Sequence, residues 1–61
     1  MKRLKSYTVN TEGNNIRLAN LAGYHAYYAD NVTAIELKAV DKNRAKLLIK
    51  NLGLKVLYIF E

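Results

Sequence analysis

The clearest pattern of apolar and polar positions lies in the second half of the chain. Apolar residues recur there at i, i+3, i+4 and i+7, the spacing of one helix face: Ala45, Leu48, Ile49 and Leu52. Asp41 precedes this stretch and can accept a hydrogen bond from an unpaired N–H of the first turn. Gly53 follows it and can adopt the left-handed conformation at little cost. We therefore predict a helix from about Lys42 to Leu52.

Two strand-like segments flank this helix. Residues 33–40 alternate between apolar and polar side chains, with Ile35, Leu37 and Ala39 on one face. Residues 54–60 are rich in branched and aromatic side chains, which favour strands. A strand, a helix and a second strand with short connections indicate a β-α-β crossover, which should be right-handed.

The first half of the chain has a less regular pattern. Residues 5–10 alternate and predict a strand. Residues 24–29 predict a second strand, and Asp30-Asn31 is typical of a hairpin turn into the next one. Residues 16–22 fit either a returning strand or a short helix, and the pattern does not decide between the two.

Together these segments predict an α+β fold: a small three- or four-stranded sheet with one amphipathic helix on one face, ending in a β-α-β unit. The chain has 61 residues, so we expect residues 1–61 to form one domain. It contains no Cys and a single His, His25. A disulfide framework and a thiolate zinc site are therefore excluded, and we expect no metal and no cofactor.

The excess of positive charge, +5 at pH 7, favours an anionic partner. Lys42, Lys46 and Lys50 fall on one stripe of the predicted helix, and Lys38 on the preceding strand would extend it. Successive lysines at this spacing lie about 6 Å apart along the axis, which suits adjacent phosphates of a nucleic acid. The alternative is a solvated helix face, since surface lysines also keep a small protein soluble.

Two further groups of residues fit nucleic-acid binding but also have simpler interpretations. Lys2, Arg3 and Lys5 form a basic N-terminal arm that could lie along a phosphate backbone, or an ordinary frayed terminus. The aromatic residues between positions 24 and 28 could stack on bases, or could pack into the core with their hydroxyl groups at its rim.

The last predicted strand is apolar on both faces. Leu57 and Ile59 point to one side, whereas the other apolar side chains of the strand share the opposite side. One helix covers only one face of a small sheet, so Leu57 and Ile59 would be exposed unless another segment covers them. Together with Leu47 and Tyr27, they are candidates for contact with a host protein or a second copy of this chain.

Nothing in the sequence indicates catalysis. The single His and the five acidic residues are scattered, there is no Cys nucleophile, and the three glycines are too sparse for a phosphate-binding loop. No apolar run approaches the roughly 18 residues of a membrane span, and the charged start of the chain lacks the apolar stretch of a signal peptide. We therefore expect a cytoplasmic protein that is not an enzyme and has no membrane partner.

The segment from Leu37 to Leu57 resembles the strand-helix-strand end of many small ββαβ domains, a layout shared by small phage proteins that inhibit host RNA polymerase. The resemblance identifies no functional residue. We expect a small basic binding module, with nucleic-acid binding through the lysine-rich helix face as the leading interpretation. The alternative is a protein-interaction or inhibitor module, encoded by a phage or mobile element, that acts through an apolar sheet face, including as a homodimer.

Overall fold

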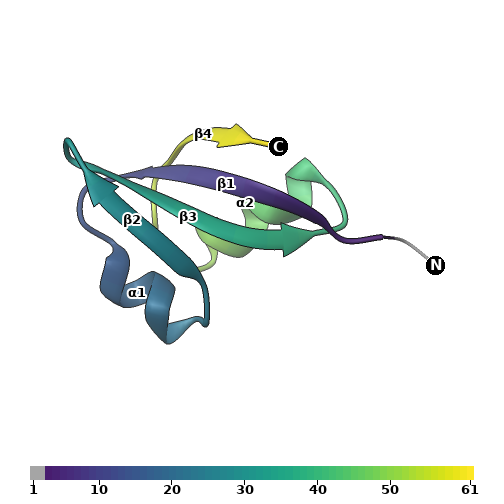
Figure 1. Cartoon of the computed structure of the whole chain (residues 1–61), viewed down its shortest axis with the longest axis horizontal. Helices are drawn as coiled ribbons and strands as arrows, with labels where there is room; N and C mark the ends of the chain where they lie inside the picture. The colour runs from purple at the N-terminus through teal and green to yellow at the C-terminus, as the bar shows by residue number, and fades with distance from the viewer. Residues whose placement is uncertain (1–2) are drawn as a thin grey trace.

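Four antiparallel strands form one sheet, and two helices pack against one of its faces (Figure 1). The computed structural model describes residues 3–61. The strands lie in the order β2-β3-β1-β4, so β1 and β3 are central and β2 and β4 are the edges. The elements are, in chain order, β1 (Lys5–Glu12), α1 (Ile16–Leu21), β2 (His25–Ala29), β3 (Val32–Ala39), α2 (Lys42–Lys50) and β4 (Val56–Phe60).

The alternating residues of the two central strands supply the middle of the core. Cross-strand pairs place these buried side chains directly opposite one another: Tyr7 with Leu37, Val9 with Ile35, and Thr11 with Thr33. Directly opposed side chains lie on the same face of a sheet, so the pairs form one continuous buried layer. The predicted inward face of residues 33–40 is confirmed.

Both helices cover this buried layer, and each contributes small or branched side chains to it. Ala19 of α1 and Ala45 and Ile49 of α2 have no exposed surface and belong to the same core cluster as the central strands. The short-helix alternative for residues 16–22 is therefore the one observed, and the expectation of a single helix is wrong. The α+β class is confirmed, with four strands and two helices.

Asp41 caps the start of α2 and Gly53 lies in the turn after its end, as the sequence predicts. The backbone N–H of Arg44 donates to the Oδ1 atom of Asp41 over 2.8 Å, which caps the first turn. The regular helix ends at Lys50, and a turn leads to Gly53, whose φ of 84° is left-handed. Because such a φ is strained for residues with a Cβ atom, glycine suits this position.

The hairpin between β2 and β3 is also the predicted one. Asp30 and Asn31 have φ angles of 52° and 63°, as expected for the tight turns that join twisted antiparallel strands. The β-α-β ending, in contrast, is not confirmed. β3 and β4 are not hydrogen-bonded neighbours, because β1 lies between them.

A small polar network in the core holds the connection between β1 and α1. Buried Thr11 donates from its Oγ1 atom to the carbonyl oxygen of Thr33 over 3.2 Å. The Thr33 hydroxyl donates to the carbonyl oxygen of Gly13 and accepts from the backbone N–H of Asn15 over 2.9 Å. The Asn15 amide group donates to the Thr11 hydroxyl over 3.0 Å and so closes the network.

The faces predicted for the last strand are correct for Val56, which packs against the core, and for exposed Leu57, but they are wrong after Leu57. Ile59, expected on the uncovered side, is buried opposite Val9, with 7% of its surface exposed. The pairing between β1 and β4 shifts by one residue at Leu57, so that Val56, rather than Leu57, lies opposite Thr11. Such a bulge reverses the alternation on its two sides.

In the described residues 3–61, no helix has the length and apolar content to cross a membrane.

The burial of α2 predicts the cost of removing one side chain. Ile49→Ala should lower the free energy of unfolding by about 2–5 kcal/mol through lost burial and a residual cavity. Leu47→Ala is the matched control: Leu47 lies on the same helix but is 48% exposed, so the change should stay within about 0.5 kcal/mol. Chemical denaturation measures both variants, and Ile49→Val offers a milder change of about 0.5–1.5 kcal/mol if the alanine variant does not fold. Equal effects of Ile49→Ala and Leu47→Ala would contradict this packing.

Because of the polar network, we expect Thr33→Val to lower the free energy of unfolding even though it preserves the shape of the side chain. Thr33→Val keeps the volume but leaves the Asn15 N–H and the Gly13 carbonyl without the hydroxyl, which should cost about 1–3 kcal/mol. Thr8→Val makes the same change on the opposite face of β1 and should stay within about 0.5 kcal/mol. Thermal or chemical unfolding compares the two, and an unaffected Thr33→Val variant would show that the network contributes little.

Candidate functional site

The face of the sheet that the helices leave open is polar at its centre. Facing pairs from β1 and β3 are Ser6 with Lys38, Thr8 with Glu36, and Asn10 with Ala34. These residues alternate with the buried ones and so point to the opposite side. Large exposed side chains border this polar centre on the edge strands: Tyr27 of β2 pairs with Ala34, and Tyr58 and Phe60 of β4 pair with Asn10 and Thr8.

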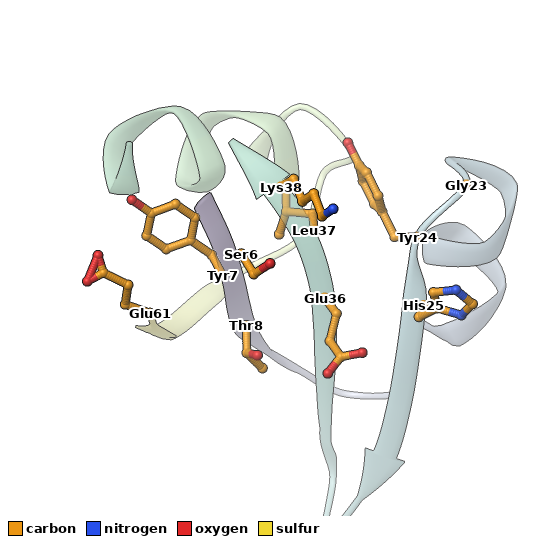
Figure 2. A pocket seen from close by; sticks show the side chains of 10 residues that line it. All are labelled: Ser6, Tyr7, Thr8, Gly23, Tyr24, His25, Glu36, Leu37, Lys38 and Glu61. Carbon is orange, nitrogen blue, oxygen red and sulfur yellow. The ribbon is translucent and has the colours of Figure 1, made fainter. Parts of the chain in front are cut away.

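A hollow of about 500 Å³ lies at one end of the sheet, where side chains of β1, β3 and the start of β2 surround it (Figure 2). Its charged lining residues are of both signs: Glu36, Lys38 and Glu61. His25 lies opposite Glu36 in the strand pairing, but no hydrogen bond or ion pair joins them in the described part of the chain. The lining therefore lacks the connected nucleophile, base and orienting group that catalysis requires.

A second, narrower hollow lies between the first turns of α2 and the edge strand β4, and we call it the α2–β4 groove. Its volume is about 260 Å³. The lining residues are Lys42, Asn43 and Lys46 from the helix and Val56, Leu57, Tyr58 and Ile59 from the strand. The lining thus combines two cations with an exposed aromatic ring and includes no acidic side chain. This combination suits an anionic ligand that also has flat apolar surfaces.

An exposed aromatic pair extends from the groove along β4. The ring centroids of Tyr58 and Phe60 lie 4.6 Å apart with their planes at 61°, an edge-to-face arrangement. The ammonium group of Lys42 lies 5.9 Å from the centroid of the Tyr58 ring, near the outer limit of a cation–π contact. The positive start of the lysine stripe and the aromatic pair therefore form one continuous surface.

Of the four lysines that were expected to form one stripe, three lie on α2 and the fourth lies on the open face of the sheet. Lys42 and Lys46 line the α2–β4 groove, and Lys50 is exposed one turn further along the same helix. Lys38 does not extend the stripe, because its side chain lies opposite Ser6 on the open face while α2 covers the other face. The expectation that Lys38 extends the stripe is wrong, because alternation places Lys38 on the face opposite Leu37 and Ala39, and the apolar side of α2 covers the face with Leu37 and Ala39.

The basic N-terminal arm lies only in part within the described chain. Lys2 is outside the described residues, and Arg3 is exposed. Lys5 forms a surface ion pair with Glu61 at 3.9 Å, and its positive charge is partly balanced there. The other ion pair among residues 3–61 joins Lys55 to Glu12 at 3.5 Å, so neither pair involves a lysine of α2.

Three of the four apolar interface candidates are exposed, and the structure does not bring them together. Leu47 lies on α2, Leu57 lies on β4, and Tyr27 lies on β2 at the far edge of the sheet. Ile59 is buried, as described above. Only Leu57 lines the α2–β4 groove.

Sequence reasoning missed Tyr58, Phe60 and Asn43 as site residues. Two aromatic residues at i and i+2 in an edge strand were a usable signal, because side chains at this spacing share one face. They were assigned to the covered side of the strand, which the bulge at Leu57 reverses.

Comparisons of the chain with protein-family models, with curated proteins and with solved structures found no match. Within residues 3–61, no group of three or more His, Cys, Asp or Glu side chains is placed to hold a metal ion. The functional interpretation of the site therefore depends on its own geometry and charge.

Proposed function

We propose that this protein is a small non-enzymatic module that binds nucleic acid, with Lys42 and Lys46 in contact with phosphate groups. The observation that carries the proposal is the α2–β4 groove, where these two cations share a lining with Tyr58 and no acidic residue. The two lysines are one helical turn apart, about 6 Å along the axis. The net charge of +5 supports attraction to a polyanion over a longer range.

The charge distribution favours the helix over the open face of the sheet as the phosphate contact. Glu36 lies at the centre of the open face, and a carboxylate there would repel a phosphate backbone. The ion pairs among residues 3–61 use Lys5 and Lys55, which leaves the α2 lysines available for an external anion. Lysine–phosphate contacts release condensed counterions, so affinity should fall as the salt concentration rises.

A salt titration tests this proposal. Lys46→Gln should lower the slope of log affinity against log salt concentration by about one, because one phosphate contact is lost. Arg17→Gln is the matched control, since it removes the same charge from α1, which packs against β2 and β3 rather than β4, and should leave the slope nearly unchanged. Fluorescence anisotropy with labelled oligonucleotides at several salt concentrations gives both slopes. Absence of binding at low salt, or equal slopes for the two variants, would contradict the proposal.

A second candidate function is protein interaction through the outer edge of β4. This five-residue strand, Val56–Phe60, carries no charge and no Pro, and within the described residues β1 is its only neighbour in the sheet. Exposed edge strands of this kind can pair with a strand from another chain. Leu57, 45% exposed on this strand, would become buried in such a pair.

Self-association provides the direct test of the second candidate. Light scattering over a dilution series should then give the mass of two copies at high protein concentration. Leu57→Lys should keep the protein monomeric, because a charge would lie in the contact. Leu21→Lys, on the highly exposed end of α1, is the control and should not change the measured mass. A wild-type monomer at millimolar concentration would rule out the homodimer.

A further inference from the structure

We infer that the α2–β4 groove, together with the neighbouring Phe60 ring, selects single-stranded over double-stranded nucleic acid, because bases stack on Tyr58 and Phe60. The inference rests on the proposed function and adds the class of nucleic acid to it. Tyr58 is 58% exposed and Phe60 is 48% exposed, so substantial ring surface is open to solvent on both residues. Single exposed rings are common on protein surfaces, but these two rings are in contact and form a joint exposed apolar patch, which is more typical of a binding surface.

The aromatic pair is accessible to an extended ligand because it lies on the open face of the sheet, opposite Asn10 and Thr8, and at the edge of that face. β4 has a strand neighbour on one side only, so no further strand borders the outer side of the pair. The edge-to-face geometry at 61° keeps the two rings from covering each other's faces completely. A base can approach such a ring by stacking, and this contact tolerates any sequence because every base has a π-face.

The cation beside the rings distinguishes this pair from the other exposed tyrosines. The Lys42 ammonium lies 5.9 Å from the Tyr58 centroid, and Lys46 lines the same groove. Tyr27 is even more exposed, at 64%, but it lies on the opposite edge strand beside Ala34. Single-strand binding surfaces combine aromatic rings with positive charge along the backbone path. Among residues 3–61, the β4 pair is the exposed aromatic group that has a cation over one of its rings.

Stacking on the rings requires exposed base faces, which a single strand offers and a duplex does not. In a duplex each base is stacked on its neighbours, and only base edges and phosphates are open to a protein. A single strand exposes the faces of its bases at little cost. The lysines can contact the phosphates of either form, whereas the aromatic pair contributes only to the single-stranded one.

Matched variants test the stacking contact separately from the charge. We expect the wild type to bind a labelled oligothymidylate single strand at least about tenfold more tightly than a duplex of equal length at the same salt concentration. Tyr58→Leu should weaken single-strand binding by about 5- to 150-fold, the range for loss of one stacked base, with an unchanged salt slope and unchanged duplex binding. Tyr58→Phe keeps the ring and should retain the affinity.

Two controls separate the inference from the proposed function. Tyr27→Leu removes an equally exposed tyrosine from the other edge and should leave binding unchanged. Phe60→Leu provides a second ring deletion if Tyr58→Leu does not fold, which circular dichroism would show. Equal binding of both nucleic acids, with a salt slope that still depends on Lys46, would overturn the inference and leave the proposed function intact.

Two other outcomes complete the test. Absence of binding to either nucleic acid would overturn both the inference and the proposed function. Displacement of the single strand by polyglutamate of similar charge, at the same concentration as by unlabelled oligothymidylate, would overturn the inference alone. Polyglutamate supplies negative charge without base faces, so equal competition would leave no role for stacking.

Discussion

Helices of six and nine residues can cover only one face of a four-stranded sheet, and the rest of the molecule is arranged around this limit. The central strands alternate between buried and exposed positions because one face packs on the helices and the other meets water. Ala19, Ala45 and Ile49 are the fully buried helix residues, and they all lie over the same layer. The centre of the opposite face is consequently polar, and the large exposed rings are confined to the edge strands.

The core of so small a domain also includes polar groups, and each of them is satisfied. Thr11 and Thr33 have no exposed surface, yet no buried side-chain oxygen or nitrogen in the described residues lacks a hydrogen-bond partner. Unpaired groups in this position would cost more than the hydrogen bonds contribute. The network formed with Asn15 also fixes how the chain leaves β1 and enters α1, which places Ala19 over the sheet.

Elements with several agreeing local signals were predictable from the sequence. α2 has a capping Asp41, a regular apolar stripe and a left-handed Gly53, and all three occur as expected. Residues 16–22 remained ambiguous because a helix of six residues, with Ala19 as its buried residue, is too short to show a helical period. The hairpin at Asp30-Asn31 was predictable because these residues tolerate a positive φ.

The faces of β4 were not predictable, and the reason is physical. Val56–Phe60 is apolar at every position, so alternation carries no information about which side is buried. The side is decided by pairing with β1 and by the bulge at Leu57, which depend on tertiary contacts. Lys38 is a different case, because the alternation of residues 33–40 already indicates that it points away from the buried face that α2 covers.

The candidate site itself is a product of topology rather than of a local motif. Lys42 and Tyr58 are far apart in sequence, and neither residue type alone indicates a ligand. They meet because α2 packs against β4 as well as the central strands, while β4 occupies an edge where the Tyr58 ring stays exposed. The rings of Tyr58 and Phe60 stand on the open face of the sheet, opposite Asn10 and Thr8, and this uncovered face exposes them to a ligand. The open edge of β4 lets Lys42 reach the Tyr58 ring from the helix side.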